Sequence, residues 1–147
     1  MPDQRVQLAL NVKDIDEAVE YYGKLFGAEV NKRKPGYANF AINEPPLKLV
    51  LFENPNADER INHLGVEVFD QKDVGVATDR FVKAGIAGEQ EIAATCCYAT
   101  QDKIWSTDPQ GLRWEWYKVL DDAETFFGEE PKNEEATEPT GAGLGCC

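Results

Sequence analysis

The sequence contains few basic residues and no long hydrophobic run. Its 147 residues include 15 Lys and Arg against 27 Asp and Glu, a formal net charge of −12. Nucleic acids and anionic membrane surfaces bind proteins through Lys and Arg, so neither is an expected partner. No apolar run is long enough to span a bilayer, and the first residues lack the basic and apolar regions of a secretory signal. We therefore expect a cytoplasmic protein.

Acidic residues are concentrated at the C-terminal end. Residues 121–147 contain eight acidic residues and one lysine, a net charge of −7 that leaves −5 for residues 1–120. The segment is rich in Glu, Pro and Gly and has little to bury. We therefore expect one domain over residues 1–120, large enough for a hydrophobic core. A disordered, flexible acidic tail follows it and ends in Cys146 and Cys147.

Two segments of the domain resemble each other. "QLALNV" begins at Gln7 and "HLGVEV" begins at His63, and in both the large apolar residues alternate with polar or small ones. A period of two residues predicts strands with one buried face. Gln7 and His63 therefore take matching positions on two matching strands.

A helical pattern follows each of these strands. Asp14 precedes the first pattern and Glu17 lies three residues further on, as in a capping box, while Gly27 suits its end. A weaker pattern of the same length ends at Gly85. Three further strands are expected after each helix, at residues 28–33, 37–42 and 47–53 and at residues 88–92, 97–108 and 113–120. The sequence thus predicts an α+β fold of two βαβββ modules, about 4–53 and 61–120, with curled mixed sheets around a shared cleft.

The double βαβββ layout resembles the vicinal-oxygen-chelate superfamily, which includes glyoxalase I, extradiol dioxygenases and fosfomycin-resistance proteins. The resemblance covers residues 4–120. It implies a divalent metal in the shared cleft, held by residues from the first and last strands of the modules. The residues at those positions are Gln7, His63 and Glu115.

A closer resemblance is carried by "RVQLALNV", "KPGYANFAI", "PPLKLVLFE", "HLGVEV" and above all "CCYATQDKIW". These segments look like those of the bacterial organoarsenical carbon–arsenic lyases and the related cadmium-induced proteins. The resemblance implies Fe(II) held by Gln7, His63 and Glu115. It also implies that Cys96 and Cys97 hold a small trivalent organoarsenical such as methylarsonous acid. O2 would then cleave the carbon–arsenic bond oxidatively to give arsenite.

The adjacent thiols support this interpretation in their own right. Neighbouring Cα atoms lie ~3.8 Å apart, closer than the ~4.4–6.8 Å usual for a disulfide, so we expect Cys96 and Cys97 to stay free thiols. Two neighbouring thiols can close around a soft centre such as As(III), Cd(II) or Zn(II); two buried structural cysteines are the alternative. Because neighbouring strand residues point to opposite faces, we expect "IAATCCYATQDK" to form a loop. Four nearby residues are expected to shape the pocket: Tyr98, Gln101, Lys103 and Trp105.

The implied ligand set suits Fe(II) or Mn(II) better than a thiolate-type zinc site. It resembles a facial triad with one His exchanged for Gln. Each of its members also has a plain alternative as a surface or packed residue, including His63, which is the only histidine. In the first module, Leu49 or Val50 stands where a fourth protein ligand would be. That loss leaves coordination positions open for O2 or water.

Two other functions fit the same sequence. The thiols, together with Cys146 and Cys147, suit a protein that sequesters cadmium or arsenite without catalysis. A glyoxalase-type isomerase suits the fold, although such sites usually have four protein ligands and do not need a cysteine pair. The sequence also leaves open whether the chain is a monomer or a homodimer.

Overall fold

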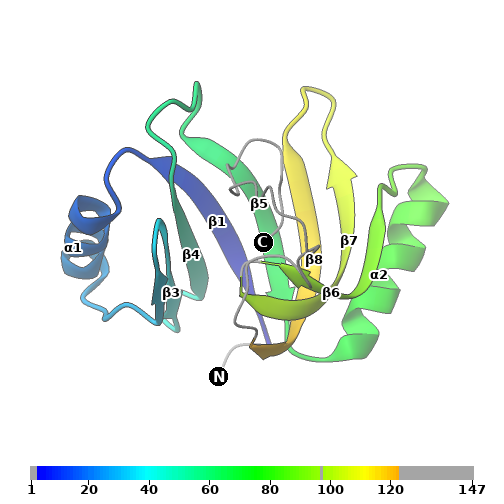
Figure 1. Ribbon diagram of the computed structural model, residues 1–147. Helices are drawn as coiled ribbons and strands as arrows, with labels where there is room; N and C mark the ends of the chain where they lie inside the picture. The colour runs from blue at the N-terminus through cyan, green and yellow to red at the C-terminus, as the bar shows by residue number, and fades with distance from the viewer. Residues whose placement is uncertain (1–2, 97, 123–147) are drawn as a thin grey trace, which may run out of the picture.

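The computed structural model describes residues 3–96 and 98–122, which form eight strands and two helices (Figure 1). The elements follow one another as β1 (Gln4–Val12), α1 (Ile15–Phe26), β2 (Lys32–Lys34), β3 (Tyr37–Ile42), β4 (Leu47–Glu53), β5 (Ile61–Val68), α2 (Gln71–Ala84), β6 (Gln90–Cys96), β7 (Ala99–Thr107) and β8 (Arg113–Asp122). Each half therefore has the predicted βαβββ order, and the predicted α+β fold is confirmed. No helix in the described part of the chain is long and apolar enough to cross a membrane.

The two modules join into one continuous sheet with the strand order β2-β3-β4-β1-β5-β8-β7-β6. The first strands of the modules, β1 and β5, pair antiparallel at its centre, whereas β1–β4 and β5–β8 pair parallel. The sheet is curled, and the helices lie outside it at opposite sides of the molecule (Figure 1). The other face of the sheet, here called the inner face, is shared by both modules.

The helices begin and end where local chemistry requires. The Asp14 side chain accepts a hydrogen bond from the backbone nitrogen of Glu17 at 3.0 Å, and Gly27 ends α1 with a φ of 62°. Asp70 caps α2 in the same manner, and Gly85 ends it with a φ of 77°. Glycine tolerates this left-handed conformation because it has no Cβ. The predicted ends of both helices are therefore confirmed.

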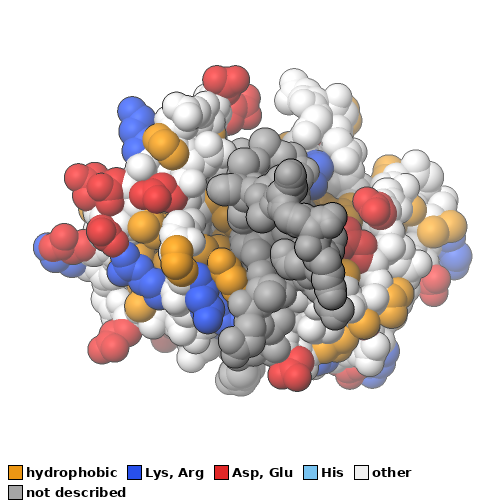
Figure 2. Space-filling model, in the orientation of Figure 1, with side chains coloured by type: hydrophobic (Ala, Val, Ile, Leu, Met, Phe, Trp, Pro, Cys, Tyr) orange, Lys and Arg blue, Asp and Glu red, His pale blue; other side chains and the backbone are white. Residues whose placement is uncertain are grey.

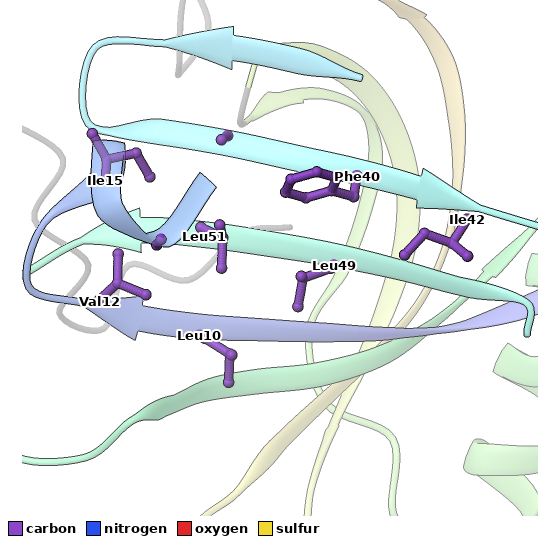
Figure 3. Close-up of a cluster of buried hydrophobic side chains, with 9 residues drawn as sticks. Leu10, Val12, Ile15, Phe40, Ile42, Leu49 and Leu51 are labelled. Atoms are coloured by element: carbon purple, nitrogen blue, oxygen red, sulfur yellow. The ribbon is translucent and has the colours of Figure 1, made fainter. Parts of the chain in front are cut away.

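The hydrophobic core lies between the sheet and the helices. One cluster packs beneath α1 and includes Leu10, Val12, Phe40, Leu49 and Leu51 (Figure 3). A second cluster packs beneath α2 and consists of Val66, Val68, Val74, Ala77, Phe81 and Ile104. Because successive strand residues point to opposite faces, the residues between these apolar positions point to the inner face.

Two predicted segments differ from the structure. The strand expected at residues 28–33 is short and runs over Lys32–Lys34. The expected loop around the cysteines is wrong in large part, because β6 runs to Cys96 and β7 begins at Ala99. Backbone pairing of Thr95 with Thr100 and of Cys96 with Ala99 forms a hairpin that leaves only a short connection.

The C-terminal prediction is tested only at its start. Strand β8 continues to Asp122, two residues beyond the predicted domain end, and pairs there with β7. The rest of the predicted acidic tail, including Cys146 and Cys147, lies outside the described residues. The division into a domain and a tail therefore stays a prediction.

Candidate metal and substrate site

The three predicted metal ligands meet on the inner face, although they come from three strands. Gln7 of β1, His63 of β5 and Glu115 of β8 are all fully buried. Glu115 Oε2 lies 3.0 Å from His63 Nε2 and accepts a hydrogen bond from Gln7 Nε2 at 2.6 Å. Gln7 Nε2 lies 3.3 Å from His63 Nε2. One imidazole, one carboxylate and one amide therefore converge on a single point.

Gly65 allows this convergence. It pairs with Gln7 on one side and with Glu115 on the other, so it separates them in the sheet. A Cβ on Gly65 would lie 2.7 Å from the carbonyl oxygen of Glu115, 2.8 Å from its Cγ and 3.3 Å from Gln7 Nε2. Gly65 is not among the residues predicted for the site, although a glycine inside a strand is itself a signal of close approach.

Lys103 balances the negative charge of Glu115. This lysine of β7 is fully buried, and its Nζ lies 2.9 Å from Glu115 Oε1, while Oε2 faces Gln7 and His63. The contact is an ion pair that lacks the geometry of a regular hydrogen bond. Burial raises the pKa of the Glu115 carboxyl, but the positive charge of Lys103 is the largest opposing influence, and the pKa is lowered to about 2. The residue is therefore a carboxylate at neutral pH.

A chain of hydrogen bonds sets the orientation of the histidine ring. Asn11 Nδ2 donates to the backbone carbonyl of Glu59 at 2.9 Å, and Asn62 Nδ2 donates to Asn11 Oδ1 at 3.1 Å. Asn62 Oδ1 then lies 2.8 Å from His63 Nδ1. A backbone carbonyl only accepts, so each amide is turned one way and His63 Nδ1 must donate. The neutral ring then keeps a lone pair on Nε2, the atom that faces Glu115.

The side chains of Gln7, His63 and Glu115 suit a divalent cation as ligands. Ligands at right angles with bonds of ~2.1 Å lie about 3 Å apart, which matches the 3.0 Å between His63 Nε2 and Glu115 Oε2. Two acceptors at this separation repel one another unless a cation or a proton lies between them. Among residues 3–96 and 98–122, no group of three or more His, Cys, Asp and Glu is placed to hold a metal, so the Gln7 amide is needed to complete the set.

Gln7 is held by a further contact with Tyr117, whose hydroxyl donates to Gln7 Oε1 at 2.5 Å. An amide binds a hard cation through its oxygen, so the Gln7 amide must turn over to act as a ligand. Rotation of the Gln7 amide keeps a hydrogen bond with Tyr117, because the tyrosine hydroxyl can also accept from the amide nitrogen. The donor set therefore stays compatible with metal binding.

The register identifies Val50 as the counterpart of Glu115. Ala9 pairs with Val50 in the first module as Gly65 pairs with Glu115 in the second. Val50 is buried on the inner face, whereas Leu49 packs beneath α1. Of the two residues proposed for the missing fourth ligand, Val50 is therefore the one at that position, and it has no donor atom.

The hairpin that carries the cysteines reaches across to the first module. The ring of Tyr98 lies 5.4 Å from the ring of Tyr37, and the backbone carbonyl of Tyr98 accepts a hydrogen bond from Lys32 Nζ at 2.8 Å. Cys96 ends β6 in this hairpin. Cys97 lies outside the described residues, so the meeting of the two thiols stays a prediction.

The four residues expected to shape the pocket are found beside the site in different ways. Trp105 lies edge-on to His63, with 5.4 Å between the ring centroids. Lys103 contacts Glu115 directly, and Gln101 is buried further along β7. Tyr98 packs against the inner-face cluster that contains Val50.

A family model described as Glyoxalase/Bleomycin resistance protein/Dioxygenase superfamily matches residues 4–116. The chain belongs to this superfamily. The resemblance seen in the sequence is thereby confirmed, and so is the fold. Gln7, His63 and Glu115 all lie within the part of the chain that matches the superfamily.

Two relatives are similar over most of their length. The cadmium-induced protein CadI of Mycobacterium tuberculosis is 54% identical over 143 residues, which cover 97% of this chain and 92% of the relative. A trivalent organoarsenical cleaving enzyme of Thermomonospora curvata is 53% identical over 123 residues, which cover 83% of this chain and 82% of the relative. Both belong to the kinds of protein that the sequence resembles.

A solved structure shows the same fold at low identity. The Mn(II)-bound glyoxalase from Novosphingobium aromaticivorans has a TM-score of 0.59 and is 22% identical, with 83% of this chain and 42% of that chain covered. At this identity the likeness concerns the fold alone.

Proposed function

We propose that this chain is an Fe(II)-dependent, O2-using lyase that cleaves the carbon–arsenic bond of trivalent organoarsenicals and releases arsenite. The observation that carries the proposal is the buried convergence of Gln7, His63 and Glu115, with Val50 in place of a fourth ligand. The relative from Thermomonospora curvata, which is named as a trivalent organoarsenical cleaving enzyme, supports the choice of substrate. The reaction would give its host resistance to such compounds.

Each part of the site has its own task in this proposal. Cys96 and Cys97 capture the arsenic as a dithiolate, which turns a dilute encounter into an intramolecular one. Gln7, His63 and Glu115 hold the iron. Bound Fe(II) supplies the redox chemistry through which O2 oxidises the carbon on arsenic, so that a methyl group leaves as an oxidised one-carbon product.

The surrounding side chains keep the centre ordered and dry. Lys103 holds one oxygen of Glu115 and leaves the other for the metal. The rings of Trp105 and Phe52 lie 5.4 and 6.5 Å from His63 and exclude water from that side. A low-dielectric surrounding strengthens the electrostatic interactions within the site.

The reducing cytoplasm is the compartment that suits this function, because it keeps Cys96 and Cys97 as thiols. A net charge of −12 agrees with a small-molecule substrate and with the absence of nucleic acid or membrane partners. Monomer and homodimer are both compatible with the site, since its residues come from one chain.

Sequestration of cadmium or arsenite is the second candidate. It is favoured by the similarity to a protein named as cadmium-induced, and the thiols alone would serve it. A glyoxalase-type isomerase is less well supported, because Val50 provides no fourth ligand. Sequestration leaves the buried ligand set without a purpose, and for that reason we prefer the lyase.

The ligand set is tested by measuring iron and arsenical binding separately. His63→Ala and Glu115→Ala should lose Fe(II) but still bind arsenicals through the thiols, and Gln7→Ala should lose less iron because a neutral amide is the weaker ligand. Cys96→Ser or Cys97→Ser should abolish turnover and leave the iron content nearly unchanged. Equal iron occupancy in the three ligand variants would refute the site.

A further inference from the structure

A cavity of about 200 Å³ opens beside the proposed metal site. Gln7 and Tyr117 form part of its wall, and so do Arg5, Lys48 and Glu67 of β1, β4 and β5. The cavity is thus continuous with the site but extends toward a group of charged residues that the reaction described above does not use.

The charge of this cavity is opposite to that of the protein. Three cations, Arg5, Lys32 and Lys48, and one carboxylate, Glu67, line it, a net charge of +2 in a chain of net charge −12. On the face seen in Figure 2, Lys and Arg side chains of the half that carries α1 lie among Asp and Glu side chains, so the positive charge belongs to the cavity lining and not to a broad surface patch. An anion is therefore the kind of group that this cavity attracts.

Two of the cations have unused hydrogen-bond donors. Arg5 donates from Nε to Glu67 Oε1 at 2.7 Å, and within the described part of the chain its two terminal amino groups make no hydrogen bond. Lys48 Nζ lies 3.7 Å from Glu67 Oε2 and likewise has no hydrogen bond to a described residue. Their side chains are only 10% and 11% exposed. Neither the Arg5 amino groups nor Lys48 Nζ is among the fully buried side-chain atoms of the described residues that lack a hydrogen bond, so they contact water in the cavity. An anionic ligand with acceptor oxygens can replace that water.

The cavity also adjoins the hairpin of the cysteines. Ala99 lines it and is the backbone partner of Cys96 in the β6–β7 pairing. Lys32, another lining residue, donates to the backbone carbonyl of Tyr98 in the same hairpin. The cavity therefore lies beside the hairpin that carries the proposed thiol site.

We propose that the cavity receives the organic group of the arsenical and that Arg5 and Lys48 bind a carboxylate on that group. The volume is sufficient, because a cavity of ~150 Å³ can hold a benzene ring. The site then prefers acidic aryl arsenicals over neutral ones of the same shape. This inference rests on the proposed function for the identity of the captured compound.

The test compares phenylarsonous acid with its 4-carboxy derivative by titration calorimetry. The metal-free full chain is titrated under nitrogen, so that binding is measured without turnover. Capture by the thiols is common to both compounds and cancels in the ratio of their dissociation constants. The wild-type protein should bind the carboxylated compound at least tenfold more tightly.

Three variants assign the preference to Lys48. Lys48→Met should bring the ratio close to one, and Lys48→Arg, which keeps the cation, should retain the preference. Lys24→Met, at an exposed position on α1, is the matched control and should behave as wild type. A wild-type ratio near one, or a preference that survives in Lys48→Met, would overturn the proposal.

Turnover of the iron-loaded protein separates this inference from the proposed function. A binding preference without cleavage of either compound in air leaves the anion subsite standing and refutes the lyase. Cleavage of both compounds without a binding preference supports the lyase and refutes the anion subsite.

Discussion

His63 Nδ1 lies 2.8 Å from Asn62 Oδ1, and this contact determines which ring nitrogen presents its lone pair to Glu115. The orientation of Asn62 is fixed in turn by Asn11, whose own amide is anchored on the backbone carbonyl of Glu59. Neither asparagine touches the point where the ligands converge. Both act through the histidine, as positioning residues for the proposed metal.

Breaking the hydrogen bonds that orient His63 should weaken metal binding without removing a ligand. Asn62→Leu leaves His63 free to protonate on either nitrogen, and loss of such a partner typically lowers metal affinity about 10–100-fold. Because His63 is the only histidine, a long-range ¹H–¹⁵N spectrum of the untagged, metal-free protein reports its tautomer directly. Asn43→Leu in the exposed β3–β4 turn is the control. A single Nδ1–H tautomer and an unchanged metal affinity in Asn62→Leu would show that the asparagine hydrogen bonds do not position His63.

Lys103→Met should strongly destabilise the fold at neutral pH. The substitution leaves the buried Glu115 carboxylate without its cation, and breaking a buried ion pair on one side costs ~3–5 kcal/mol. Urea unfolding measures the effect. Restoring neutrality in the double variant Lys103→Met/Glu115→Gln should recover much of the loss, whereas additive losses would mean that Lys103 and Glu115 do not depend on one another.

The destabilisation should also depend on pH. In the wild-type protein the pKa of Glu115 is lowered from its ordinary value of 4.5 to about 2. Glu115 therefore contributes stability above pH 4.5, and this contribution is lost as the pH falls toward 2. Without Lys103 the pKa rises, so the difference between wild type and Lys103→Met should be largest at neutral pH and should shrink as the solution is acidified.

Gly65→Ala should disrupt the site from within the sheet. The new Cβ would lie 2.7 Å from the Glu115 carbonyl oxygen, so β8 or the Gln7 side chain must move. Overpacking of this kind costs about 1–3 kcal/mol, and Fe(II) affinity should fall with it. Gly75→Ala in α2, where a Cβ meets nothing within 4 Å, is the control and should stabilise the fold by about 1 kcal/mol. Equal unfolding midpoints for both variants would contradict the close approach.

The acidic tail can be removed at a position that spares β8. Strand β8 pairs with β7 up to Asp122, so truncation should follow Asp122 rather than Leu120. If Cys146 and Cys147 only raise the local concentration of substrate, the truncated protein should keep the rate at saturating substrate and lose activity when substrate is scarce. Inactivity at saturation would make the tail part of the fold or of the site.

Local sequence patterns predicted most of the fold, because strand alternation and helix caps depend on residues that are close together in the sequence. The repeat of "QLALNV" and "HLGVEV" identified Gln7 and His63 as equivalents. Asp14, Gly27 and Gly85 predicted three of the four helix caps, and Asp70, the N-cap of α2, was not predicted. The metal ligands were obtained from the family resemblance, and their convergence required strand pairing that no local pattern contains.

The supporting residues escaped prediction for physical reasons. An alternating pattern shows which face a side chain occupies but not how close two strands approach, so Gly65 went unnoticed and Leu49 was not separated from Val50. Lysine is rarely buried, and no local pattern indicated that the expected pocket residue Lys103 would be fully buried and paired with Glu115. The hydrogen bond between Asn11 and Asn62 joins two strands that are far apart in the sequence, and only the pairing register of β1 and β5 brings these residues together.

Product analysis in air and under nitrogen tests the central claim most directly. The full chain, loaded with Fe(II), is incubated with methylarsonous acid, and arsenite is separated from the substrate by chromatography with arsenic detection. The proposed lyase predicts arsenite together with an oxidised one-carbon product in air, and neither under nitrogen. Arsenite formed equally under both atmospheres would contradict the use of O2, and bound but unchanged methylarsonous acid in air would show that the protein sequesters its ligand and is not a lyase.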